Sequence, residues 1–228
     1  GGIGYMLERE LRNVLIEKRI EKNVITVVTQ VLVDKDDPAF QNPSKPVGAF
    51  FLEEEADLLM KNHSWIFKED AGKRGWRRVV ASPYPKEILN KSIIKNLASK
   101  GNIVIAAGGG GVPVYRDKNK LLHGIEAVID KDLASALMAL EIGADALYMI
   151  TDVPKVYINF NKPGQKALDV ITVKEAEEYL NSGEFGEGSM KPKIRAAIEF
   201  LKHGGKETII TDSARLNNPE SGTRIVLN

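Results

Sequence analysis

The chain of 228 residues contains no cysteine, which excludes disulfide bonds and thiolate metal sites and is compatible with the cytosol. Its three histidines, His63, His123 and His203, are far apart and lack the spacing of zinc ligands, so no metal site made by the protein alone is predicted. No apolar run is long enough to span a bilayer, and no signal peptide is visible. Charge is balanced, with 32 basic and 31 acidic residues, so neither nucleic acid nor membrane is indicated as a partner.

The composition changes sharply between Asp34 and Pro85. This segment holds five of the ten prolines and several charged runs, among them KEDAGKRGWRR. Prolines and turn residues at this density argue against a central sheet. We therefore expect an inserted subdomain over residues 34–85 that stands off the main body and contains one helix, at Leu52–Lys61.

The remaining chain alternates between helical and strand patterns. Helices are predicted over residues 4–18, 86–100, 133–142, 173–180 and 194–202, and strands over residues 24–33, 102–107, 146–150, 156–160, 207–211 and 223–227. The segments 112–115 and 121–129 flank the polar turn DKNK as in a β-hairpin. This alternation predicts an α/β fold with a mostly parallel sheet covered by helices on both faces.

Four consecutive glycines, Gly108, Gly109, Gly110 and Gly111, follow the apolar strand. Ligands of open α/β sheets lie at the carboxyl ends of strands, and glycine allows backbone N–H groups to approach an anion. No GxxxxGK[ST] or GxGxxG pattern accompanies the run. A plain tight turn would explain it equally well.

The start of the helix at 133–142 carries a more specific signal, Asp130-Lys131-Asp132. Asp130 is a good N-cap, which places Lys131 in the first helical turn, where the helix dipole disfavours a cation. A lysine in this position indicates an anion nearby. The alternative is a solvated lysine whose position costs a few tenths of a kcal/mol.

A second helix start repeats this arrangement in the segment GSMKPK. Ser189 or a neighbour is expected to cap the helix, Pro192 suits an early helical position, and Lys193 is predicted to lie in the first turn. Two lysines at helix starts are what phosphoryl transfer requires, because that reaction depends on fixed cations around the charged oxygens.

The inserted segment adds further basic candidates. Lys45 lies close to two prolines, which would hold it on a stiff stem, and Arg74, Arg77 and Arg78 surround Trp76. Such residues could present charge to a substrate. A solvated surface loop is the competing interpretation.

Several long motifs resemble those of the carbamate kinases, which belong to the amino acid kinase superfamily. They are DPAFQNPSKPVG, KEDAGKRGWRRVVASP, AAGGGGVPV, GIEAVIDKDLASAL, LYMITDV and GSMKPKIRAA, in family order over essentially the whole chain. The resemblance implies reversible phosphoryl transfer between ATP and carbamate, with Mg²⁺ carried by the nucleotide, in the degradation of arginine. It also implies a cytoplasmic homodimer and a three-layer αβα fold, here one amino acid kinase domain over residues 1–228, with 34–85 as its protruding lid.

The resemblance assigns roles to individual residues. Lys131 matches a lysine that contacts the transferred phosphate, and Lys193 matches one that reaches the nucleotide phosphates. Asp132, with Asp130 beside it, falls where an aspartate organises the active-site lysines, and Lys45 matches a lid lysine that approaches carbamoyl phosphate. The four glycines are expected to lie on the side of the active site that binds the substrate.

The nucleotide pocket is expected to include Thr151, Asp152, Phe160 and Met190, in addition to Lys193. Phe160 replaces a tyrosine that is common in the family, which removes a hydroxyl and keeps the apolar wall. Two further departures are the additional Lys73 and Glu184, which stands where histidine is usual.

The largest departure is at the front of the chain. The family's GGNA and HGNGP loops, which grip phosphate, do not occur in this sequence, and Gly1 falls within the family's third helix. Since lost oxyanion donors cost orders of magnitude in rate, we expect this chain alone to be at best weakly active. The alternatives are an acetylglutamate kinase relative, which the long lid disfavours, and a non-catalytic fragment that keeps the nucleotide half and the dimer surface.

Overall fold

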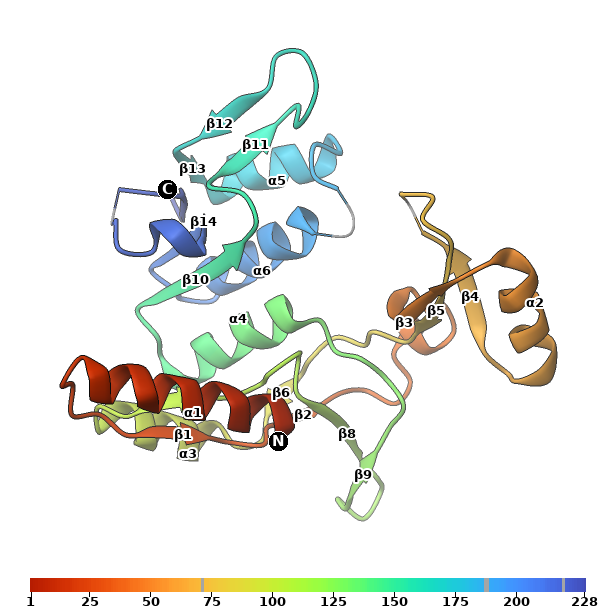
Figure 1. The fold of residues 1–228 in the computed structure, drawn as a ribbon, viewed down its shortest axis with the longest axis horizontal. Coiled ribbons are helices and arrows are strands. Elements are labelled where there is room, and N and C mark those ends of the chain that lie inside the picture. The colour runs from red at the N-terminus through yellow and green to blue at the C-terminus, as the bar shows by residue number, and fades with distance from the viewer. Residues whose placement is uncertain (71, 187–188, 219) are drawn as a thin grey trace.

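The computed structural model describes residues 1–70, 72–186, 189–218 and 220–228. Over these residues the fold is mixed α/β, as predicted, with six α-helices and several small sheets (Figure 1). The predicted motifs EDAGKRGWRR and GSMKPK each include one residue, Ala71 and Gly188, outside the described residues.

The N-terminal part begins with helix α1, Gly2–Glu17, followed by strand β1, Val24–Thr26, and strand β2, Gln30–Leu32. The single long strand predicted over 24–33 is wrong. The chain breaks at Thr29, whose buried hydroxyl donates to the Val27 carbonyl and accepts the Ala107 N–H. The break separates β1 and β2 into different sheets.

These strands have different partners. Strand β1 pairs in parallel with β7, Ile103–Ile105. Strand β2 lies between β8, Val112–Arg116, to which it is parallel, and β6, Glu87–Ile88, to which it is antiparallel. The predicted hairpin forms between β8 and β9, Leu122–Gly124, although its second strand is shorter than expected.

A second sheet is formed by the C-terminal part of the chain. Its strands are, in spatial order, β10 (Ala146–Thr151), β14 (Glu207–Asp212), β15 (Thr223–Val226) and β13 (Val170–Thr172). A separate hairpin pairs β11, Val156–Ile158, with β12, Lys166–Leu168. Strands β12 and β13 were not predicted. Apart from the hairpins and the inserted segment, the parallel pairs β1–β7, β2–β8, β10–β14 and β13–β15 outnumber the antiparallel pairs β14–β15 and β2–β6, as expected for a mostly parallel sheet.

Besides α1, which contacts β1 and β7, four helices pack on these sheets: α3 (Lys91–Ser99), α4 (Lys131–Ile142), α5 (Val173–Asn181) and α6 (Met190–Lys202). Helix α3 starts later than the predicted residue 86, because Ile88 is drawn into pairing with β2 and its N–H donates to Glu141 of α4. Helix α4 ends, as predicted, at Gly143 in the left-handed conformation, with φ of 73°.

Helix α4 lies between two hydrophobic cores. Ala136 and Ala139 belong to the core shared with α5, α6 and the β10 sheet, whereas Ala134 belongs to the core with Val31, Ile88 and Ile94. A helix buried on opposite faces needs small apolar residues all round, which explains the sequence LASALMAL. In Figure 1, α4 runs between the two groups of elements, which brings its N-terminus to the centre of the molecule.

The inserted segment forms a small unit of its own. Its antiparallel sheet has the order β3 (Lys45–Phe51), β5 (Trp76–Val80) and β4 (Ile66–Glu69), and helix α2 (Glu53–Asn62) contacts β4 and β5. Figure 1 shows this unit standing apart from the rest of the molecule. Two short 3₁₀ turns, η1 (Pro38–Phe40) and η2 (Ser213–Arg215), complete the described elements.

Candidate functional site

The start of α4 carries the most specific prediction, and the structure forms it as expected. Asp130 is the N-cap, and its Oδ1 accepts hydrogen bonds from the N–H groups of Asp132, at 2.9 Å, and Leu133, at 3.3 Å. These bonds satisfy two amides that the helix itself leaves unpaired. Lys131 therefore occupies the first position of the helix.

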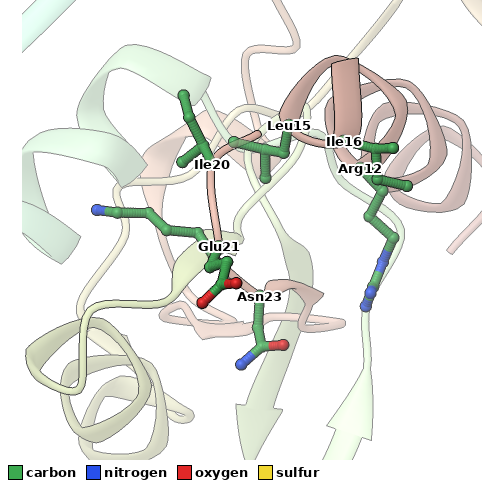
Figure 2. A pocket seen from close by; sticks show the side chains of 7 residues that line it. Arg12, Leu15, Ile16, Ile20, Glu21 and Asn23 are labelled. Carbon is green, nitrogen blue, oxygen red and sulfur yellow. The ribbon is translucent and has the colours of Figure 1, made fainter. Parts of the chain in front are cut away.

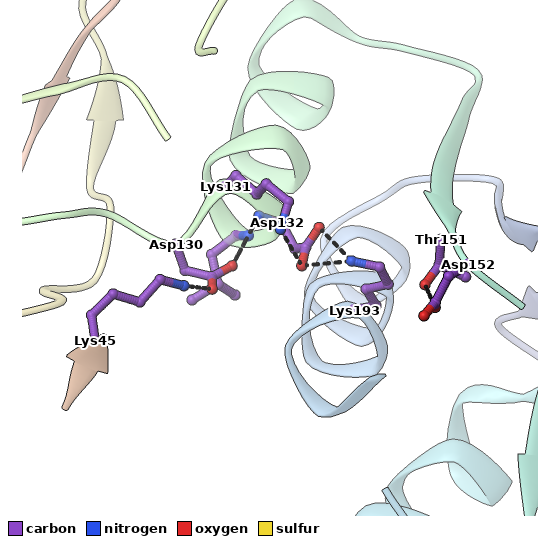
Figure 3. Close-up of polar contacts among 8 residues, drawn as sticks. Lys45, Asp130, Lys131, Asp132, Thr151, Asp152 and Lys193 are labelled. Carbon is purple, nitrogen blue, oxygen red and sulfur yellow. Dashed lines mark hydrogen bonds and ion pairs between the residues drawn. The ribbon is translucent and has the colours of Figure 1, made fainter. Parts of the chain in front are cut away.

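Two lysines converge on Asp132, as Figure 3 shows. The Lys193 Nζ lies 3.2 and 3.1 Å from the two carboxylate oxygens, and both side chains are buried. The Lys131 Nζ lies 3.8 Å from Oδ2, while its side chain is 58% exposed. The structure thus brings together two ammonium groups from separate helix starts, one buried and fixed and the other free to reach an incoming group.

A third lysine comes from the inserted unit. Lys45, the first residue of β3, places its Nζ 2.6 Å from Oδ2 of Asp130 (Figure 3). Burial raises the pKa of the Asp130 carboxyl. The hydrogen bond and charge of Lys45, together with the two capping amides, lower this pKa by more than burial raises it, so the net pKa is below its usual value. Asp130 is therefore ionised at neutral pH.

The four glycines divide into two pairs. A Cβ at Gly110, which has φ of +134°, would lie 2.2 Å from the Ile129 carbonyl oxygen, and a Cβ at Gly111 would lie 2.4 Å from Val31. Gly108 and Gly109, in contrast, have open space where a Cβ would be. The close packing around Gly110 and Gly111 leaves no room for a Cβ, and Gly108, Gly109 and Gly111 border a cavity.

This cavity has a volume of about 540 Å³, and its wall continues from the glycines to Thr29 and to Ala127 and Val128, just before Asp130. The N–H groups of Gly108, Gly110 and Gly111 donate to carbonyls of Ala106 and Ala107 within the turn. The amides are thus used largely by the turn itself. Thr29, which holds the turn through the Ala107 N–H, was not identified from the sequence, where only a β-branched run is visible.

A second cavity, of about 280 Å³, lies at the N-terminus of α6. Three of the predicted nucleotide-binding residues line it: Asp152, Phe160 and Met190. Thr151 is not among the residues that line it, and its hydroxyl donates to Oδ1 of the adjacent Asp152 at 3.0 Å (Figure 3). Because Met190 and Lys193 are three residues apart on α6, this cavity lies one helical turn from the lysine pair.

Sequence reasoning missed part of this wall. Tyr157 and Phe185 line the cavity with Phe160, whose ring lies 5.7 Å from that of Tyr157. Glu184 was noted only as a departure, but it also lines the cavity, and its Oε2 accepts the N–H of Asn159 at 3.0 Å. The signal available in the sequence was the aromatic pair Tyr157 and Phe160, which lies within and just after β11.

Another recess, of about 350 Å³, lies at the C-terminal end of α1 (Figure 2). Arg12 lines it, but its guanidinium donates to the Val24 carbonyl and to Glu8, so it holds α1 against β1. None of its lining residues is a predicted site residue. We therefore place the candidate site at the start of α4 and not here.

Within the described ranges, no three histidine or acidic side chains cluster so as to hold a metal ion. A search of the same residues for membrane spans finds no helix with the required length and apolarity.

Comparisons with known proteins show the family of this chain. A sequence model described as the amino acid kinase family matches residues 49–212. The carbamate kinase of Thermoplasma acidophilum is 50% identical over 222 residues, which is 97% of this chain and 72% of that protein. A structure of the carbamate kinase from Giardia lamblia bound to citric acid is 44% identical, with a TM-score of 0.91, over 100% of this chain and 72% of that one. A second Giardia structure, bound to AMP-PNP, is 45% identical, with a TM-score of 0.87, over 100% of this chain and 73% of that one.

Proposed function

The chain belongs to the amino acid kinase family and, within it, to the carbamate kinases, and from this premise we propose how its residues divide the reaction between them. The reaction is reversible phosphoryl transfer, carbamoyl phosphate plus ADP giving carbamate plus ATP. The observation that carries the assignment of the site is the convergence of Lys131 and Lys193 on Asp132 at the start of α4.

In the ATP-forming direction, an oxygen of the ADP β-phosphate attacks the phosphorus of carbamoyl phosphate. The bond between phosphorus and the bridging oxygen breaks, and carbamate leaves with the bonding electrons. Charge on the phosphoryl oxygens must be stabilised throughout, and this is the main task of the protein. We assign it to the ammonium groups of Lys131 and Lys193, with Asp132 fixing the buried lysine.

The nucleotide binds, in this proposal, in the cavity at the start of α6. Phe160 and Met190 supply an apolar wall for the base, and the chain leads from Met190 to Lys193 in one turn, which directs the phosphates toward the lysines. Mg²⁺ bound together with the nucleotide would supply additional positive charge to the phosphates. The bound AMP-PNP of the Giardia relative supports a nucleotide site in this fold.

The acyl phosphate binds on the other side of the start of α4. Gly108 and Gly109 border the adjoining cavity without side chains, and Lys45 reaches Asp130 at the start of α4 from the inserted unit. We propose that residues 34–85 act as a lid over this side of the single kinase domain. The two substrates then meet at Lys131.

We also propose a homodimer in the cytoplasm, acting in arginine degradation. Helix α1 exposes much of its apolar surface, with Met6 at 58% and Ile16 at 74%, and such a surface is better stabilised by a partner than by water. A second copy of the chain is the partner proposed. ATP, ADP and carbamoyl phosphate are cytoplasmic metabolites.

The direct test is formation of ATP from carbamoyl phosphate and ADP, followed in a coupled assay, with carbamate and N-acetylglutamate compared as acceptors in the reverse direction. Activity that requires carbamate and is abolished in Lys193→Met supports the proposal. Turnover with N-acetylglutamate, or full activity of Lys193→Met, contradicts it.

A second candidate is nucleotide binding without turnover. It is favoured by one observation, namely that three of the four glycine amides bond within their own turn and are not directed at a ligand. Calorimetry that shows ADP binding, combined with an assay that shows no ATP formation at high enzyme concentration, would establish this candidate.

A further inference from the structure

Asp130 has a second role besides capping α4. Its Oδ1 accepts the two helical amides, whereas its Oδ2 binds the Lys45 ammonium at 2.6 Å. One carboxylate therefore joins two parts of the molecule, the first turn of α4 and the inserted unit. The two bonds use different oxygen atoms, so they can be separated by substitution.

Lys45 lies at the base of the inserted unit, so its contact with Asp130 acts where the unit joins the main body. Lys45 is the first residue of β3 and lies opposite Val80, the last residue of β5. Both strands thus enter and leave the inserted unit at this level. A bond made here sets the distance between the base of the unit and α4.

Among the described residues, other contacts join the same two regions. The Val128 N–H donates to the Ala81 carbonyl at 3.0 Å, just after β5, and a further ion pair is of a weaker kind. Arg78 of β5 lies 2.6 Å from Glu126, but the Glu126 side chain is 81% exposed, and pairs of this kind contribute little to stability. The Asp130 side chain is only 12% exposed and that of Lys45 is 31% exposed. The Asp130–Lys45 pair is therefore the stronger of the two.

The local electrostatics also explain why Lys45 needs a negative partner at this position. Lys45 approaches the N-terminus of a helix, where the dipole and the neighbouring Lys131 are already positive. A negative group must offset this charge. In the free protein it is the Asp130 carboxylate, and a phosphate bound at the same helix start offers the equivalent charge and acceptor oxygens.

We propose that Asp130 is a positioning residue, which holds Lys45 at the start of α4 until the acyl phosphate binds and then transfers it to the phosphate. This inference rests on the proposed function for the identity of the anion, although the ion pair does not depend on it. The anion competes with Asp130 for Lys45, and the inserted unit follows its lysine toward the substrate.

The experiment compares Asp130→Asn, which keeps an oxygen for the capping amides but has no charge for Lys45, with Asp130→Ala, which loses both. Glu126→Gln removes only the exposed contact and serves as the matched control. Acylation of lysines is followed residue by residue by mass spectrometry, with the exposed Lys35 as internal reference. The anion probe is phosphonoacetamide, in which a methylene replaces the bridging oxygen of carbamoyl phosphate.

Without ligand, Lys45 should react several times faster in Asp130→Asn than in the native protein or in Glu126→Gln. Phosphonoacetamide with ADP should protect Lys45 in Asp130→Asn. Asp130→Asn should lower kcat/KM for carbamoyl phosphate about tenfold and leave KM for ADP unchanged, a split that loss of structure alone would not produce. Asp130→Ala should also lower Tm, because the cap is lost.

Equal Lys45 reactivity in the native protein and Asp130→Asn overturns the inference, even if the enzyme turns over normally. Lack of protection by phosphonoacetamide with ADP in Asp130→Asn overturns the transfer to the anion. Conversely, a reactivity difference in a protein with no turnover supports the ion pair and counts against the proposed function only.

Discussion

The ammonium of Lys193 and the carboxylate of Asp132 form a buried pair, with Nζ within 3.2 Å of both oxygens. The two residues come from helices α6 and α4 and meet where those helices pack against each other. Neither charge has enough contact with water to be stable alone. The same pair therefore serves the proposed catalysis, through Lys193, and the stability of the fold.

Asp132→Asn should lower the free energy of unfolding by about 3–5 kcal/mol, because it leaves the Lys193 ammonium buried without a counter-charge. Chemical denaturation measures this loss. The double variant Asp132→Leu with Lys193→Met should recover much of the stability, since it removes both charges, while remaining inactive. If the free energy of unfolding lost in the double variant equals the sum of the losses in the two single variants, the two residues do not interact.

Gly110→Ala should destabilise the protein by about 2 kcal/mol or more, because the added Cβ would lie 2.2 Å from the Ile129 carbonyl oxygen at a φ of +134°. Gly109→Ala is the matched control, since its Cβ would meet no atom within 4 Å. Thermal unfolding of the two variants should separate them clearly. Equal Tm values would contradict the close packing of the turn on Ile129.

The Asp130 carboxyl should make stability depend on acid pH. Its pKa is lowered in the folded state below an unfolded value of about 3.9, so its contribution is fully present above that value and is lost as the pH falls through the folded pKa. The difference in free energy of unfolding between the native protein and Asp130→Asn should therefore shrink as the pH falls below about 4. Denaturation curves at a series of pH values test this. A difference that stays constant down to pH 2 would show that the contribution of Asp130 is not electrostatic.

Phe160→Ala should weaken ADP binding about five- to tenfold, because an aromatic face that stacks on a base contributes about 1 kcal/mol or more. Titration calorimetry with ADP measures the change. Phe50→Ala is the control, since Phe50 lies in the inserted unit beneath Arg74 and Arg77. The assignment of the cavity fails if both variants bind ADP as the native protein does.

Local signals in the sequence predicted much of this structure. The N-cap at Asp130, the stop at Gly143 and the hairpin of β8 and β9 depend on neighbouring residues, and all three are confirmed. The failures involve partners distant in sequence. The run 24–33 divides at Thr29 because its two halves pair with different strands, and residues 87–88 leave the predicted helix because they pair with β2.

The candidate site shows the same division. That Lys131 and Lys193 stand at helix starts, and that the chain belongs with the carbamate kinases, followed from the sequence, because caps and motifs are written in consecutive residues. That Lys45 reaches Asp130, and how closely Lys193 approaches Asp132, was decided only by the return of β3 to the main body and by the packing of α4 on α6. Buried charges take the partners that tertiary structure places within reach, because in an apolar interior an unpaired charge costs several kcal/mol.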